Sequence, residues 1–311
     1  MSTMTEPRRG MLEMVAAMVL MGTVGYFVVE AGQNAHDVVF YRCLFGAGFL
    51  ALYCWARGYF RGSGLTRKAL LMAAASGVFL VLNWVMLFAS FKTASISTAT
   101  VIYHTQPFFF VIMGAIFLRD ALTLDKTVWI LLAFIGVVLV VNVDPADLTL
   151  SSTYVFGVAL ALSAAVFYAI TSIIVKQLKA VRPHVIALVQ VAVGAVILFP
   201  FANMDALPGI TGVQWSYLLV LGAVHTCLTY ILMYSAFQKL TTPVIAVLSF
   251  IYPAVAILVD YVAYDESLDA TQMLGVVLIL FSSFAVSQNL PAVWRNVSQR
   301  VGSLFVRAPR A

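Results

Sequence analysis

The chain has 311 residues, of which 62% are hydrophobic and only 10% are charged. Its mean hydropathy is +0.99 and its net charge is +5. A soluble globule of this composition would have too few polar residues to cover its surface, so the composition excludes a soluble domain and indicates an integral membrane protein.

Ten apolar stretches follow one another along the chain, each long enough to cross about 30 Å of hydrocarbon as a helix. Their approximate ranges are 11–31, 38–55, 69–91, 95–118, 127–143, 154–175, 185–202, 215–237, 242–264 and 271–288. Arg42 and Gln190 interrupt the second and seventh stretches. The runs are too continuous for the alternating strands of a membrane barrel, so we predict an all-α fold with ten transmembrane helices.

The basic residues predict the orientation of these helices. With the N-terminus in the cytoplasm, sixteen of the 18 Lys and Arg residues fall on the cytoplasmic side, Lys92 falls outside, and Arg42 lies within a span. Cytoplasmic loops are enriched in Lys and Arg, so both termini are expected inside. The same residues supply much of the net positive charge, so no nucleic-acid partner is expected.

The two halves of the chain share a pattern at an offset of 146 residues, at which Pro107 matches Pro253 and the acid Asp120 matches Glu266. Each half contains five predicted spans, an odd number, so the second half enters the membrane from the opposite side. This arrangement is the inverted-topology repeat of many secondary transporters. The predicted units are a first repeat at 1–147, a second repeat at 148–290 and a basic cytoplasmic tail at 291–311.

Ten spans in a five-plus-five inverted repeat, an arginine early in the second span (Arg42) and the repeated proline-then-acid segments resemble the EamA family of the drug/metabolite transporter superfamily. The resemblance implies a multi-pass exporter of metabolites in the bacterial inner membrane. The amino-acid exporters, including those for aromatic amino acids, are the best-fitting subgroup. Alternating access is the mechanism that the inverted repeat favours.

A candidate substrate site surrounds the two matched prolines. His104 lies near the middle of the fourth span, where an ionisable group is costly and therefore a candidate for function. Pro107 cannot donate a backbone hydrogen bond, so it frees a carbonyl near Tyr103. Tyr252 precedes Pro253 in the second half. We predict that both prolines interrupt their helices beside the substrate, although kinks that serve only packing would give the same pattern.

Further candidates lie at similar depth in the third and eighth spans. Asn83 and Trp84 match Thr229 and Tyr230 at the repeat offset, and His225 lies close by in sequence. These side chains could line a pocket for an apolar or aromatic solute. The alternative is that the histidines are satisfied by neighbouring hydroxyls and the aromatic rings pack between helices.

Arg42 has two possible roles. It could bind a substrate carboxylate in bidentate geometry, or it could form a structural ion pair with Glu30, Asp37 or Asp260 near the outer surface. We favour the ion pair, because a side chain near the interface can also reach polar surroundings. If transport is coupled to protons, His104 and Asp260 are the candidates.

The sequence favours a facilitative exporter of neutral and aromatic amino acids over two alternatives. One is a proton-coupled carrier of another metabolite or drug, for example a nucleotide sugar, and the other is a membrane scaffold or receptor. No phosphate-binding loop or metalloprotease motif is present, so we expect neither direct use of ATP nor an enzyme. The three cysteines have no metal-ligand spacing, so no metal or cofactor is expected. The expected partners are a small-molecule substrate and lipids, with the chain as a monomer.

Overall fold

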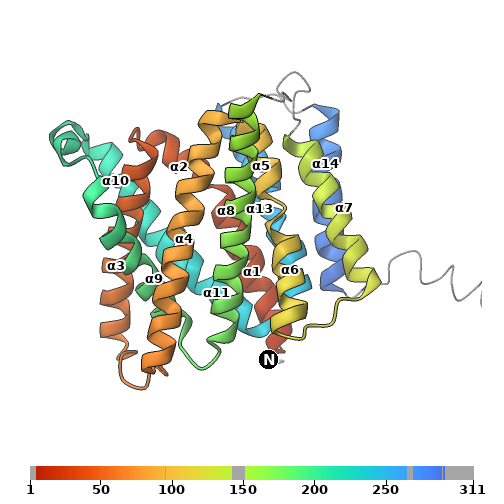
Figure 1. The fold of residues 1–311 in the computed structure, drawn as a ribbon, viewed down its shortest axis with the longest axis horizontal. Coiled ribbons are helices and arrows are strands. Elements are labelled where there is room, and N and C mark those ends of the chain that lie inside the picture. Colours follow the sequence, from red (N-terminus) through yellow and green to blue (C-terminus); the bar gives the residue numbers. More distant parts are fainter. Residues whose placement is uncertain (1–4, 95, 142–150, 265–268, 289, 291–311) are drawn as a thin grey trace, which may run out of the picture.

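The computed structural model describes residues 5–94, 96–141, 151–264, 269–288 and 290. Every regular element within these residues is a helix, and the helices form an upright bundle (Figure 1). Ten spans are long and apolar enough to cross a membrane, so the all-α fold and each of the ten predicted spans are confirmed. They run over Glu6–Glu30, His36–Ala56, Arg67–Ser90, Ala99–Leu118, Leu124–Val141, Ser152–Gln177, Pro183–Phe201, Gly212–Lys239, Thr242–Tyr264 and Ala270–Ser287. The predicted tail 291–311 and Glu266 lie outside the described residues.

Several spans consist of more than one helical element. In the first half the elements are α1 (Glu6–Gly22), α2 (Val24–Glu30), α3 (Ala35–Ala56), α4 (Arg67–Thr93), α5 (Ile96–Tyr103), α6 (Gln106–Phe117) and α7 (Leu124–Val141). In the second half they are α8 (Ser152–Gln177), α9 (Pro183–Leu198), η2 (Phe199–Phe201), η3 (Met204–Gly209), α10 (Gly212–Val220), the π-helical segment η4 (Leu221–Leu228), α11 (Thr229–Lys239), α12 (Thr242–Ser249), α13 (Ile251–Tyr264) and α14 (Ala270–Ser287).

Breaks divide three of the spans into two α-helices each. The first breaks at Thr23, the fourth at residues 104–105, and the ninth at Phe250. Pro107 lies in the first turn after its break and Pro253 in the first turn after its own, where a missing backbone N–H costs nothing. The breaks at residues 104 and 250 lie at the repeat offset of 146.

Helix bounds recur at the same offset. Helices α5 and α12 begin and end 146 residues apart, and so do α7 and α14. The first and eighth spans depart from this regularity, because α8 is continuous where α1 and α2 are separate, and α4 is regular where its counterpart contains η4. The helix bounds therefore agree at this offset in α5, α7, α12 and α14 and differ in the first and eighth spans.

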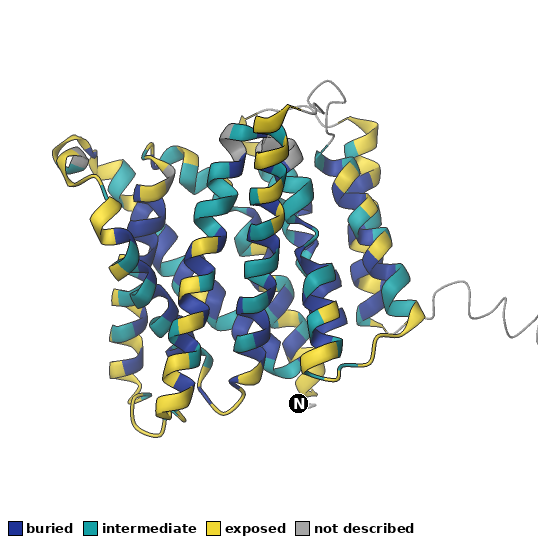
Figure 2. Cartoon of the chain, viewed as in Figure 1, coloured by how far each residue is buried: buried dark blue, intermediate teal, exposed yellow. Residues whose placement is uncertain are grey.

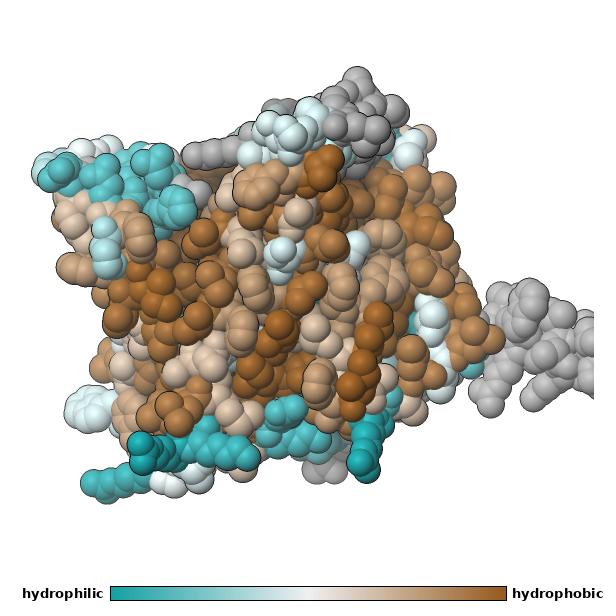
Figure 3. Space-filling view, viewed as in Figure 1, coloured by the Kyte–Doolittle hydropathy of each residue, from teal (hydrophilic) through white to brown (hydrophobic). Residues whose placement is uncertain are grey.

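Helices from the two halves pack against each other throughout the bundle. Helix α4 packs on α8 and α11 packs on α1, while α3 packs on α9 and α7 packs on α14. Buried residues lie on inward-facing surfaces, and exposed ones gather at helix ends and connections (Figure 2). A hydrophobic belt lies between hydrophilic rims at the two ends (Figure 3), which is the surface that a bilayer requires.

We call the end of the bundle that carries the N-terminus and the α3–α4 and α8–α9 connections the N-terminal end (Figure 1). The opposite end, which carries the α2–α3 connection and η3, is the far end. The predicted topology would place the N-terminal end in the cytoplasm.

The α7–α14 pair shows how closely helices approach in this bundle. A Cβ at Gly275 would lie 2.6 Å from the Gly136 carbonyl oxygen and 2.8 Å from the Val140 backbone nitrogen. Both are backbone atoms, so neither can move aside without shifting a helix. Small residues permit such contact where lipid provides no hydrophobic drive for association.

Gly275→Ala should therefore lower the melting temperature of the purified protein in detergent, because the new methyl group overpacks the contact at a cost of about 1–3 kcal/mol. Gly48→Ala is the matched control. Gly48 is also helical, but a Cβ there meets nothing within 4 Å, so the greater helix propensity of alanine should leave the melting temperature equal or higher. Equal effects of the two substitutions would contradict the close α7–α14 contact.

Candidate functional site

The interrupted fourth and ninth spans bring His104 and Tyr252 together. Their rings are stacked with centroids 5.2 Å apart and an interplanar angle of 19°. His104 Nδ1 lies 2.6 Å from the Thr100 carbonyl oxygen, so this nitrogen carries the proton and donates. In the neutral ring Nε2 is then an acceptor, and it is buried without a hydrogen-bond partner among the described residues. The stack therefore offers an unused acceptor beside an aromatic face.

Other tyrosines extend this aromatic surface. The ring of Tyr103 lies 6.0 Å from that of His104 and 6.3 Å from that of Tyr168, approaching both edge-on. Tyr103 also lies close enough to Asn83 and Tyr230 for electrostatic interaction. Residues from both halves of the chain thus meet at the predicted depth.

Asn83 and Trp84 lie next to each other on α4 but make different contacts. Asn83 is fully buried and donates to the Ala164 carbonyl oxygen at 2.8 Å, which ties α4 to α8. The ring of Trp84 instead lies under the Arg42 guanidinium, whose central carbon is 5.5 Å from the ring centroid. Asn83 therefore supports the packing of α4 on α8, and Trp84 contacts the charged residue.

Arg42 is buried, with 6% of its surface exposed, and it donates from Nε to Thr226 Oγ1 at 3.4 Å. The predicted ion pair with Glu30 or Asp37 is not formed. Glu30 instead accepts a hydrogen bond from the Tyr264 hydroxyl, and Asp37 accepts one from the backbone N–H of Asn203.

The Arg42 side chain instead contacts Trp84 of α4 and Thr226 of η4, whereas the two acids are engaged by Tyr264 and Asn203. The side chain of Asp260 lies outside the described residues. Among those residues the structure gives Arg42 no carboxylate within 4 Å. A buried guanidinium in this position is costly unless an anion pairs with it.

The π-helical segment η4 positions the partner of Arg42. Thr226 Oγ1 donates to the Leu221 carbonyl oxygen at 2.8 Å, and Thr229 Oγ1 donates to the Val224 carbonyl oxygen at 3.0 Å. The two hydroxyls thus satisfy carbonyl groups inside the distorted segment. Single π-helical turns of this kind occur frequently at functional sites.

His225 joins η4 to the break in the first span. Its Nε2 lies 2.8 Å from Thr23 Oγ1, and that hydroxyl donates to the Leu20 carbonyl oxygen at 2.8 Å. The hydroxyl therefore accepts from Nε2–H. The His225 ring also packs against Phe27, with centroids 4.7 Å apart. The structure thus places His225 beside Arg42 and the first-span break, with Nε2 bonded to a hydroxyl and Nδ1 buried without a hydrogen-bond partner among the described residues.

Sequence reasoning missed a buried polar network at the centre of the bundle. Gln190 donates to Ser76 Oγ at 2.7 Å and accepts from the Tyr234 hydroxyl, and Thr171 donates to the Ser76 carbonyl oxygen at 3.2 Å. The network connects α4, α8, α9 and α11. Its one signal in the sequence was the polar Gln190 within an otherwise apolar span.

Ionic contacts connect the two halves at the N-terminal end. Asp120 Oδ2 accepts from the backbone N–H and the hydroxyl of Thr242, at 2.9 and 2.7 Å, and from Lys176 Nζ at 3.3 Å. Glu13 and Lys239 form a second pair across the halves at 2.5 Å. Partial burial raises the pKa of Asp120, but the Thr242 hydrogen bonds and the Lys176 charge outweigh it and hold that pKa below its usual range.

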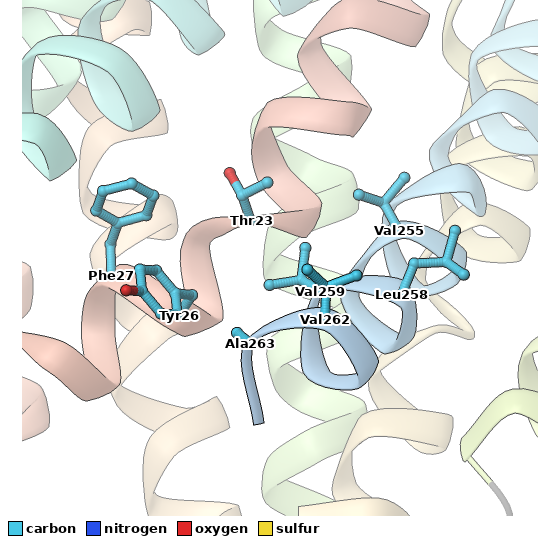
Figure 4. A pocket seen from close by; sticks show the side chains of 8 residues that line it. All are labelled: Thr23, Tyr26, Phe27, Val255, Leu258, Val259, Val262 and Ala263. Atoms are coloured by element: carbon cyan, nitrogen blue, oxygen red, sulfur yellow. The ribbon is translucent and has the colours of Figure 1, made fainter. Parts of the chain in front are cut away.

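Three cavities lie away from the His104–Tyr252 stack. A crevice of about 410 Å³ separates α2 from α13 beside the break at Thr23, with Tyr26 and Phe27 on one side and the valines of α13 on the other (Figure 4). An aromatic groove of about 560 Å³ lies between α3, α9 and Trp215. The third, of about 470 Å³, lies at the far end between α3, α4 and residues 201–203, and Asp37 lines it. We call it the far-end cavity.

The sequence profile of the EamA-like transporter family matches residues 8–142 and again residues 155–288. The chain belongs to the EamA-like transporter family. It is therefore a multi-pass membrane transporter of small molecules, and membership of a family of transporters agrees with the expectation that it is not an enzyme.

Relatives of known sequence agree with this assignment. The chain is 31% identical over 277 residues to the uncharacterized transporter YxxF of Bacillus subtilis, covering 89% of this chain and 88% of that one. It is 28% identical over 286 residues to the pseudopaline exporter CntI of Pseudomonas aeruginosa, covering 90% and 96%. A solved crystal structure with 18% identity superimposes with a TM-score of 0.78 over 91% of this chain and 96% of that chain, which supports the fold.

Asp120→Asn should remove one pH-dependent contribution to stability. A carboxylate whose folded pKa is lowered stabilises the protein fully above the unfolded pKa of about 4, and this contribution is lost as pH falls through the folded pKa. The melting temperature of the variant in detergent should be lower than that of the wild type at pH 7, and the difference should shrink below about pH 4. Asp205→Asn, at an exposed position near the far end, should have little effect at either pH. A difference for Asp120→Asn that does not change with pH would contradict this account.

Proposed function

We propose that this protein exports neutral and aromatic amino acids across the bacterial inner membrane by facilitative alternating access. One observation carries the proposal: Arg42 is a buried guanidinium that stacks on Trp84 and has no carboxylate partner among the described residues. The α-carboxylate of an amino acid would provide an anion for this guanidinium. The proposed orientation places the N-terminal end in the cytoplasm, as the distribution of basic residues indicates.

The chemistry around Arg42 suits such a substrate. A guanidinium binds a carboxylate through two parallel hydrogen bonds, and these are stronger away from water. Tyr230, which is buried, lies within electrostatic reach of both Arg42 and Tyr103. It therefore links the charged group to the aromatic surface formed by Tyr103, His104 and Tyr252. An apolar or aromatic side chain would pack on that surface while the carboxylate remained at Arg42.

The asymmetry of the two ends supports alternating access. Ionic contacts join the halves at the N-terminal end, whereas the far-end cavity lies open between helices at the other. The interrupted fourth and ninth spans provide hinges on either side of the His104–Tyr252 stack, and Pro107 and Pro253 keep these hinges from closing into continuous helix. We propose that opening of the Asp120 and Glu13 contacts admits substrate from the cytoplasm.

A second candidate is export of another carboxylated metabolite. The chain is similar along its length to a pseudopaline exporter, and Arg42 would accept the carboxylate of many solutes. The two candidates share the anion site and differ in what the aromatic surface contacts.

Arg42→Gln should reduce counterflow of labelled phenylalanine into proteoliposomes by about 10- to 100-fold, because hydrogen bonds to charged groups contribute about 1.5–3 kcal/mol. Arg42→Lys should retain part of the activity, since it keeps the charge and loses the planar fork. Arg57→Gln is the matched control, because Arg57 also stacks on an aromatic ring, Tyr59, but is exposed at the end of α3. Full activity of a folded Arg42→Gln variant would place the carboxylate site elsewhere.

A further inference from the structure

The far-end cavity contains a buried carboxylate that the central site does not use. Asp37 lies in the first turn of α3 and only 4% of its surface is exposed. One oxygen, Oδ1, accepts from the backbone N–H of Asn203 at 2.8 Å and so caps the start of η3. The structure gives Oδ2 no partner among the described residues. This oxygen is the one available for a ligand.

The rest of the lining combines polar groups with aromatic rings. Asn34, His36, Thr93 and Asn203 contribute the polar groups, and Phe88 and Phe201 contribute aromatic walls. Aromatic faces and a carboxylate together attract an ammonium group with an apolar substituent. The volume of about 470 Å³ is in the range of small-molecule sites.

The far-end cavity lies nearer the far end than the Arg42 site, and both are bounded by α3 and α4. Asp37 faces the α4 residues Phe88 and Ala89 across the cavity, and Arg42 stacks on Trp84, one turn of α4 nearer the centre. A basic group therefore lies deep and an acidic group lies shallow on the same side of α4. When the carboxylate of an amino acid is at Arg42, its ammonium group can lie on the side of Asp37. Each charge of the solute is then on the side of a protein group of opposite sign.

We propose that the far-end cavity is a second substrate site, in which Asp37 binds the ammonium group of the solute on its way between Arg42 and the far side. The proposal rests on the proposed function for the identity of the solute, but the ammonium site itself can be measured separately. The aromatic walls assign it to primary amines with an aryl or large apolar group.

Two single-charge probes separate the sites in binding titrations with the purified protein at pH 8. The first, 2-phenylethylamine, has the ammonium without a carboxylate, and the second, 3-phenylpropionate, has the carboxylate without an ammonium. Asp37→Asn should weaken binding of 2-phenylethylamine at least tenfold and leave 3-phenylpropionate unchanged. Arg42→Gln should do the reverse. The asparagine keeps an amide oxygen for the Asn203 N–H, so the cap on η3 is retained.

The matched control is Asp205→Asn, which removes the same charge from an exposed position near the same end and should change neither affinity. Melting temperatures establish that each variant is folded. Unchanged binding of 2-phenylethylamine to Asp37→Asn, or equal weakening of both probes, would overturn the ammonium site. If Arg42→Gln left the binding of 3-phenylpropionate unchanged while Asp37→Asn still weakened the binding of 2-phenylethylamine, the proposed function would be overturned. The Asp37 site would remain supported.

Discussion

Hydrocarbon offers no hydrogen-bond partner to a backbone group or a charge. Side chains inside the bundle must therefore satisfy the backbone groups that each break in a transmembrane helix leaves unpaired. The polar centre of this protein follows from that constraint. Thr23 and His225 join the break in the first span to the π-helical segment, and the hydroxyl of Thr226 both satisfies that segment and accepts from Arg42. The groups that hold the distorted helices are thus the same groups that orient the buried cation.

The ionic contacts that join the halves at the N-terminal end involve lysines that the repeat does not place at the far end. Lys176, which binds Asp120 at the N-terminal end, has the acidic Glu30 as its counterpart at the repeat offset, and Lys239 has Thr93. The two lysines of these ionic contacts therefore have no basic counterpart at the repeat offset. In the proposed cycle the halves separate by breaking these ion pairs at the N-terminal end and different contacts at the far end, which makes the two conformations energetically distinct.

The fold was predictable from the sequence because length and hydropathy alone determine which segments cross a membrane. The breaks near His104 and Phe250 were predictable from Pro107 and Pro253. The break at Thr23 and the π-helical segment lack such a residue and depend on partners distant in sequence. Depth along a helix suggested Glu30 or Asp37 as the partner of Arg42. The direction of the Arg42 side chain decides its contacts, which are with Trp84 and Thr226. The network of Gln190, Ser76 and Tyr234 likewise depends on how three helices are rotated.

The measurement that tests the central claim most directly is uptake of labelled amino acids, aromatic and aliphatic, into proteoliposomes that contain the purified wild-type protein, with and without an imposed pH gradient. The account predicts saturable uptake of phenylalanine in the absence of a gradient, inhibited by neutral amino acids and unaffected by amino-acid amides that lack the free carboxylate. Uptake that requires the gradient would contradict facilitative transport. Absence of uptake by protein shown to be folded would contradict the amino-acid substrate.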